Sequence, residues 1–149
     1  MKKEKKAISP LSGGIFLIAA LIVASLFMSC KKDKEEKPDW KVVNAQDFEY
    51  NMTYMSQISF DGKTSRNVLT EIAALVNGEC RGKANLVYES GLDIYLFHLT
   101  IYSNTASGED IVFHVFNPDK KKIYKNCGTL TFRSNASEGG ADNVLDCRK

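Results

Sequence analysis

Cys30 is the first residue of this chain whose surroundings point to a definite chemistry. It follows the small residue Ser29 and an uncharged apolar run of 14 residues, Ile15 to Met28. A membrane-spanning helix needs about 20 apolar residues, whereas a shorter run behind a basic head is typical of a secretory signal. The sequence therefore predicts an exported protein in which Cys30 directly follows the cleavage point.

The junction before Cys30 resembles the cleavage box of a bacterial lipoprotein, in which the chain is cut before the cysteine and the thiol then carries lipid. It departs from the usual box in two ways. The usual box has leucine three places before the cysteine, where this chain has Phe27, and its leucine, Leu26, lies one place earlier. Met28 is also larger than the usual alanine or serine. This tolerant form resembles the boxes of Bacteroidota lipoproteins. The resemblance implies a lipid anchor on Cys30 at the outer membrane. The alternative is an ordinary secreted protein with a plain thiol.

A dense run of charge, KKDKEEK over residues 31–37, follows the cysteine. Such a segment has nothing to bury, so it is predicted to stay disordered and solvated. The predicted organisation is a signal peptide over 1–29, the lipidated cysteine and a charged tether over 30–38, and one domain over 39–149. The charged cluster also resembles tags that send some Bacteroidota lipoproteins to the cell surface, although a generic spacer would look the same.

The three remaining cysteines would lie in a compartment that permits disulfides. Cys80 shares a predicted strand face with small and apolar residues, so it is expected to be a buried thiol. Cys127 and Cys147 flank a polar stretch over 134–143, and a disulfide between them is predicted to hold the C-terminal segment to the rest of the domain. A Cys80–Cys127 bridge is the main alternative. The spacing of cysteines and histidines does not fit a zinc site.

The two histidines raise the question of a metal site or a pH switch. His98 and His114 would lie opposite each other if the strands around them formed a hairpin. Two histidines without a third ligand make a poor metal site. Sheet histidines that are packed or half-exposed are the favoured interpretation, and no metal or cofactor is predicted.

Catalytic patterns are weak throughout the sequence. The Gly-x-Ser-x-Gly turn of a serine nucleophile is absent, and Cys80 in a strand interior would be a poor nucleophile. Carboxylates beside loops could support glycoside hydrolysis, most readily if some clustered with His98 in a cleft; they are Glu89, Asp93, Glu109 and Asp110. We predict no catalytic residue and a protein that is not an enzyme, with a small hydrolase as the least favoured alternative.

Arg81 is the candidate for a ligand-binding residue. It follows a predicted hairpin turn, and its guanidinium could bind a carboxylate or stack on a ring. An ion pair with Glu79 or Glu71 is the alternative. Tyrosines, the usual material of a face that binds sugar or protein, lie at positions 50, 54, 88, 95, 102 and 124.

Alternating apolar and polar residues predict strands along the whole domain. Residues 48–60 alternate with a period of two, interrupted near the centre where a bulge could shift the pattern. Asn77-Gly78 is a strong hairpin signal between the run 71–76 and a return strand over 79–88. Further strands are predicted over 93–103, 111–116, 123–124, 129–133 and 144–147. Short strands between turns predict an all-β fold, an antiparallel immunoglobulin-like β-sandwich, with a barrel as the alternative.

Several segments resemble a β-sandwich module that recurs in surface and secreted proteins of Bacteroidota: EYNMTYM, EIAALVNGECRGKA, YLFHLTIYSN, IVFHVFN and LTF. The likeness covers most of residues 40–135, and its most specific part is Glu-Cys-Arg-Gly at 79–82. The module often has phenylalanine where Leu75 stands, and it usually belongs to larger chains. Its activity is not settled, so the resemblance implies a fold and a location.

The net charge of the chain argues against nucleic acid as a partner. The formal net charge is +2, of which residues 1–29 carry +3, so the chain from Cys30 on has a net charge of −1. Nucleic-acid binding needs a basic surface, and the lysines at 120–122 are interpreted as a solvated turn. We predict an outer-membrane lipoprotein at the cell surface whose sandwich binds a protein partner or a glycan. A periplasm-facing accessory or inhibitor is the alternative.

Overall fold

The structure, a computed structural model, describes residues 34–42 and 44–148. The predicted signal peptide and Cys30 lie outside the described residues. The described part is all-β, as the alternation predicts, and its one 3-10 helix, η1, is short (Ala45–Asp47). The strands are β1 (Tyr50–Phe60), β2 (Lys63–Thr64), β3 (Glu71–Val76), β4 (Glu79–Asn85), β5 (Val87–Glu89), β6 (Ile94–Ser103), β7 (Ser107–Asn117), β8 (Lys122–Arg133) and β9 (Ser137–Cys147).

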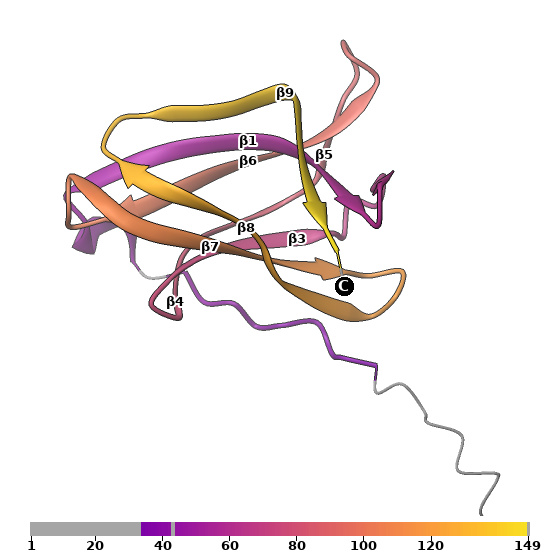
Figure 1. Ribbon diagram of the computed structural model, residues 1–149, viewed down its shortest axis with the longest axis horizontal. Coiled ribbons are helices and arrows are strands. Elements are labelled where there is room, and N and C mark those ends of the chain that lie inside the picture. Colours follow the sequence, from indigo (N-terminus) through magenta and orange to yellow (C-terminus); the bar gives the residue numbers. More distant parts are fainter. Residues whose placement is uncertain (1–33, 43, 149) are drawn as a thin grey trace, which may run out of the picture. The chain divides into compact units, whose positions relative to one another are not determined.

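Two sheets form a sandwich, which confirms the predicted fold class (Figure 1). One sheet has the order β2-β1-β6-β5, with β9 added beside β1, and the other has the order β4-β3-β7-β8. Neighbouring strands run antiparallel except for β1 and β9, which pair in parallel. This pairing brings the end of the chain back to the first strand of the domain.

The pairing of β1 with β9 shifts register between Met55 and Gln57, where the alternation of the sequence breaks. One residue of β1 there faces four residues of β9 (140–143), so the bulge predicted within 48–60 lies in the partner strand. Ser56 at this point is fully buried on a face that is otherwise apolar. Its hydroxyl donates to the backbone oxygen of Asn143 at 2.9 Å. The bulge thus supplies the hydrogen-bond partner that a buried hydroxyl needs.

The core between the sheets consists mainly of large apolar side chains. Tyr54 contacts two phenylalanines from different sheets, with ring centroids 5.4 Å from Phe97 and 4.9 Å from Phe113. The largest fully buried side chains of the core include Phe97, Phe113, Phe132, Met52, Ile58, Ile72, Leu99, Ile101, Ile111 and Val115. Removal of this apolar surface from water is the main force that holds the two sheets together.

Two strand predictions are wrong in their connectivity. The predicted strand 79–88 is two strands in different sheets, because the chain crosses at Leu86, which is buried and donates its N–H to the Thr70 oxygen at 3.1 Å. The predicted hairpin of β6 with β7 also does not form, since those strands lie in opposite sheets. His98 therefore lies opposite Met55, and His114 lies opposite Ala73.

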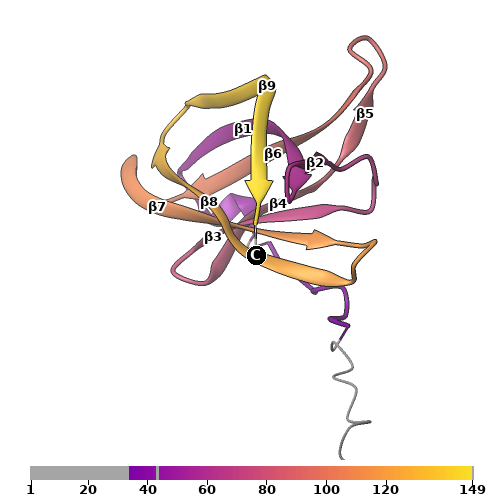
Figure 2. The same cartoon turned by 45° about the vertical axis from the view of Figure 1, so that its right-hand side comes forward.

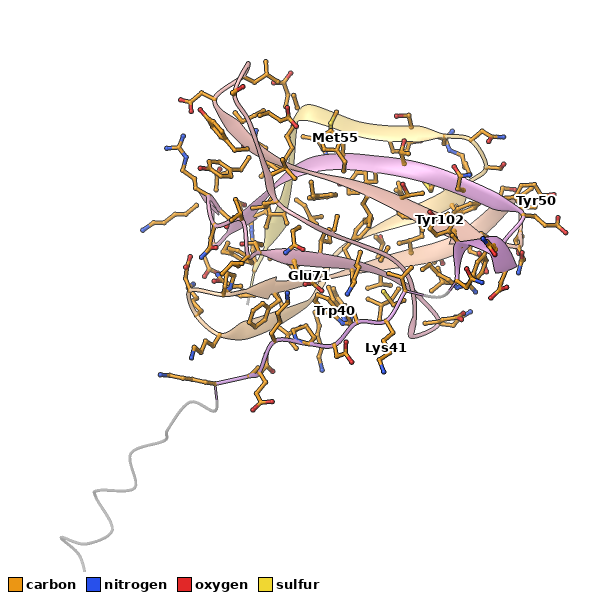
Figure 3. The ribbon with its side chains drawn as sticks, turned by 180° about the vertical axis from the view of Figure 1, so that it is seen from behind. Trp40, Lys41, Tyr50, Met55, Glu71 and Tyr102 are labelled. Atoms are coloured by element: carbon orange, nitrogen blue, oxygen red, sulfur yellow. A yellow bond between two sulfur atoms is a disulfide. The ribbon has the colours of Figure 1, made fainter. Side chains whose placement is uncertain are left out.

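Residues 34–42, here called the N-terminal strap, lie along the sheet that contains β3 and β7 (Figure 3). The N–H of Glu35 donates to the Lys121 oxygen at 2.9 Å, and the Lys37 ammonium lies 2.7 Å from the Glu71 carboxylate. The described part of the charged run therefore contacts the domain, unlike the solvated tether that its composition predicts. The reason is Glu71, whose buried carboxylate requires an opposite charge.

Candidate functional site

Large exposed apolar side chains of the described residues lie mostly in two segments, with Val144 on β9 as the exception. Two lie in the loop between β2 and β3, and three lie in the hairpin formed by β5 and β6. We call them the hairpin patch: Val68 is 51% exposed, Leu69 62%, Val87 52%, Tyr88 45% and Leu92 60%. Figures 1 and 2 show that the hairpin projects beyond the rest of its sheet. A cluster of this kind marks an interaction site more often than scattered apolar residues do.

Cross-strand pairing fixes the tyrosines of the hairpin. Tyr88 on β5 lies opposite Tyr95 on β6, and their ring centroids are 5.1 Å apart. The Tyr88 hydroxyl donates to the Asp93 carboxylate at 2.9 Å, and this hydrogen bond raises the pKa of Tyr88. An aromatic cross-strand pair of this kind stiffens a hairpin that has few other neighbours.

The loop before β3 is joined to the hairpin by a single arginine. The Arg66 guanidinium lies 3.6 Å from the Asp93 carboxylate and 5.7 Å from the centre of the Tyr95 ring. At the base of the loop, the buried hydroxyls of Ser65 and Thr70 are hydrogen-bonded at 2.9 Å. Arg66 therefore links the loop to the face of the hairpin that carries Tyr88 and Tyr95, while Val87, the preceding residue of β5, points to the other face.

Polar groups surround the hairpin patch. Besides Arg66 and Asp93, the imidazole of His98 lies 3.3 Å from the Glu89 carboxylate. An apolar centre with charged residues at its edge is the usual anatomy of a protein-binding surface. The patch has the composition for binding, with aliphatic side chains and a tyrosine that fit against a partner.

The cluster that would favour an enzyme forms only in part. Glu89 and His98 come together, but their side chains are 41% and 57% exposed, and Asp93 is engaged by Tyr88 and Arg66. General acid-base chemistry gains most from an enclosed site that changes the pKa of its groups. Within the described part of the chain, no group of three or more histidine, cysteine or acidic residues is placed to hold a metal ion.

Arg81 is held by internal contacts. Its side chain is 13% exposed, and its guanidinium bonds to the Glu79 carboxylate at 2.8 Å, so the ion pair with Glu79 forms. The same group lies 4.6 Å from the centre of the Phe48 ring and 3.4 Å from the Tyr102 oxygen. The other predicted acid, Glu71, pairs with Lys37 instead. Arg81 thus ties β4 to β6 and lies outside the hairpin patch.

The three cysteines of the described residues behave as the sequence predicts. Cys127 and Cys147 form a disulfide with their Cα atoms 4.5 Å apart, and Cys80 is a buried free thiol. Burial raises the pKa of Cys80, which keeps the thiol protonated and unreactive. Next to the bridge, Asp146 accepts hydrogen bonds from Ser59, Arg148 and Gly62, and the first of these does most to lower its pKa to about 2.

The second histidine does not join a site. Burial is the main cause that lowers the pKa of His114, and the charge of Lys125 adds to it. His114 lies on β7 and His98 on β6, in opposite sheets. The favoured sequence interpretation, sheet histidines that are packed or half-exposed and do not share a ligand, agrees with this arrangement: His98 is exposed beside Glu89, and His114 is partly buried.

The hairpin patch is the feature that sequence reasoning missed. The segment LVYESGLDIY contains a recognisable turn at Ser90-Gly91, but its apolar residues read as strand residues of the core. Only the crossing at Leu86 reveals that Val87 and Tyr88 leave the core. A break in alternation at Leu86-Val87-Tyr88, where three apolar residues stand in a row, is the one signal that could have indicated it.

Comparison with known proteins finds no matching family model, no matching curated relative and no matching solved structure. Among the described residues, no helix has the length and apolar character required to cross a membrane.

Proposed function

We propose that this chain is a non-enzymatic lipoprotein of the cell envelope that binds a protein partner through the hairpin patch. The observation that carries the proposal is that the projecting hairpin exposes the apolar side chains of Val87, Tyr88 and Leu92. A glycan, the other ligand class compatible with the sequence, is less well matched. Sugars are usually held by polar side chains beside an aromatic ring, whereas four of the five patch residues are aliphatic.

The internal bonding of the patch supports a binding role. Arg66 contacts both Asp93 and Tyr95, so the loop and the hairpin are ordered before any partner arrives. A surface that is already ordered loses little conformational entropy on association, and more of the contact energy remains as affinity. Leu92 at the tip and Tyr88 on the strand are the residues that we expect to contribute most.

The anchor is the second part of the proposal and concerns Cys30. It is supported by the apolar run, the small residue before the cysteine, and the charged residues that follow. We expect Cys30→Ala to move the protein from the membrane fraction to the soluble fraction of a Bacteroidota host, while Cys80→Ala, which removes a buried thiol, leaves it in the membrane. Fractionation with immunodetection is the measurement.

Two outcomes would change the anchor proposal. If Cys30→Ala and the wild type fractionate alike, Cys30 carries no anchor. If the wild type is in the membrane but protease added to intact cells leaves it uncut, the protein faces the periplasm, and the accessory or inhibitor role replaces display at the cell surface. Digestion of the domain on intact cells supports the surface location.

For the hairpin patch, we expect Leu92→Glu to weaken partner binding by a factor of about 30, the effect of losing a residue worth about 2 kcal/mol. A photo-reactive residue at position 92 in living cells should yield a cross-linked protein adduct, which identifies the partner whose affinity is then measured. The matched control is Val144, which is 45% exposed but lies on β9, away from the patch.

The comparison of the two positions decides the patch proposal. Equal adducts at 92 and 144, or equal affinities for Leu92→Glu and Val144→Glu, would show that the hairpin patch is not the binding surface. Retention of a polysaccharide by the wild type but not by Tyr88→Ala, without any protein adduct at 92, would assign the patch to a glycan instead.

A further inference from the structure

The N-terminal strap begins at one end of the sandwich, beside the turn between β7 and β8. The N–H of Glu35 donates to the Lys121 oxygen at 2.9 Å, and the Glu35 carboxylate accepts from the N–H of Ile123. Figure 1 shows the strap running from this turn along the sheet toward η1. The chain therefore enters the domain at the β7–β8 turn.

The strap is fastened to the sheet by a buried charge. The Glu71 side chain is only 4% exposed, and Lys37 lies 2.7 Å from one of its oxygens, whereas Lys83 is 3.9 Å from the other. Detaching the strap would remove the closer partner of a buried carboxylate, which is strongly unfavourable. Residues 34–42 therefore do not lengthen the connection between the domain and an anchor.

The connection that remains is short compared with the domain. Three residues stand between Cys30 and Lys34. A fully extended chain spans at most about 14 Å over the four Cα steps from position 30 to position 34. Strand β7, which has 11 residues, is about 36 Å long at the usual rise per residue. An anchor at Cys30 would thus hold the β7–β8 turn near the membrane and leave the other end of β7 far from it.

The chemistry of this turn fits a membrane surface. It carries Lys120, Lys121 and Lys122, and Lys34 enters beside it. Lys120 is bonded to Asp61 at 3.1 Å, the carboxylate of Glu35 is engaged by a backbone N–H, and Asp119 of the turn accepts from Asn67. The exposed acids of the strap are then Glu36 and Asp39, and Asp39 lies 3.7 Å from the Lys41 ammonium. Basic residues next to an anchor are attracted to anionic headgroups.

We propose that the β7–β8 turn, with its lysines at 120–122, rests on the anionic headgroups of the membrane and fixes the orientation of the sandwich. The proposal depends on the lipidation of Cys30 put forward above. Asn67 donates to Asp119 of the turn at 2.7 Å, which places the loop before β3 at the same end of the domain as the turn.

The test compares two single-cysteine sites in the full, lipidated protein. A fluorophore is attached to Lys121→Cys or to Ala106→Cys, an exposed position just before β7. Each protein is reconstituted into vesicles of phosphatidylcholine and phosphatidylglycerol that carry a quencher at the headgroup. We expect the probe at 121 to lose most of its emission and the probe at 106 to lose little. Wild-type protein, whose free thiol is buried, controls for stray labelling.

A flexible Gly-Ser insertion of about 20 residues between Asp33 and Lys34 adds a reach of about 25 Å. The insertion should reduce the quenching of the probe at 121 to a value closer to that of the probe at 106. This reduction should be larger in vesicles of phosphatidylcholine alone, which lack the anionic headgroups. Equal quenching at the two sites before the insertion would overturn the orientation. Protein that does not float with vesicles at all would instead contradict the lipid anchor, so the two proposals fail in different ways.

Discussion

Replacing both Cys127 and Cys147 by alanine should lower the free energy of unfolding by about 3 kcal/mol. The bridge joins residues 20 positions apart. Closing a loop of that length restricts the unfolded chain, and the chain-entropy model gives this loss when the restriction is removed. Among the described strands, β9 pairs only with β1, so the bridge to β8 is its covalent tie to the opposite sheet.

The loss is measured by urea unfolding of the wild type and the double variant, followed by circular dichroism. Cys80→Ala is the matched control for cysteine removal. It truncates a small buried side chain without touching a covalent link, and its effect should be about 1 kcal/mol or less. Wild-type protein in a reductant should approach the double variant. Unfolding midpoints that coincide for the wild type and the double variant would show that the bridge contributes nothing to stability.

The alternation of residues was sufficient to predict the sandwich and most strand positions. It divided β8, which is one strand over Lys122–Arg133, and it recognised only the last residues of β9, whose polar first half carries no apolar alternation. It located the hairpin at Asn77-Gly78, and it indicated an irregularity near Ser56, although the extra residues of that irregularity lie in β9 and not in β1. The pairing of Cys127 with Cys147 followed from their position around the polar tail. These features depend on residues close together in the chain, which is why they can be read from the sequence.

What the sequence could not show depends on contacts between distant segments. The assignment of β6 and β7 to different sheets follows from how each strand finds its neighbours, and the alternation of both strands is compatible with a hairpin. The strap follows from one buried carboxylate, Glu71, that recruits Lys37 from a charged run. Val87 and Tyr88 are exposed because the chain crosses to the other sheet at Leu86. No alternation of apolar and polar residues in the sequence marks this change.

The candidate site residues also divide into what the local sequence indicates and what only contacts between distant segments reveal. Arg81 was identified as a residue of interest from its position after the turn, and the structure gives that position a role in packing. Its neighbour Gly82 belongs to the segment Glu-Cys-Arg-Gly, the most specific part of the resemblance noted in the sequence. The physical reason for a glycine there appears only when β4 is seen against β6.

Gly82→Ala should destabilise the domain by about 1–3 kcal/mol or more, because no space exists for the added methyl group. A Cβ atom at position 82 would lie 2.2 Å from the backbone oxygen of Thr100 on β6 and 3.2 Å from the Leu99 side chain. The oxygen cannot move aside easily, since Thr100 is paired with Thr53 and Gly82 is paired with Ala74. One of the two sheets would have to shift at the margin where β4 meets β6.

Gly91→Ala is the matched control for this substitution, since a Cβ atom there meets nothing within 4 Å. We expect the control to change the free energy of unfolding by about 0.5 kcal/mol or less. Urea unfolding of both variants gives the comparison directly. If Gly82→Ala were as stable as Gly91→Ala, β4 and β6 would not approach as closely as the structure has them. A large loss at position 82 alone would show that this margin closes the sandwich through direct contact of the two backbones.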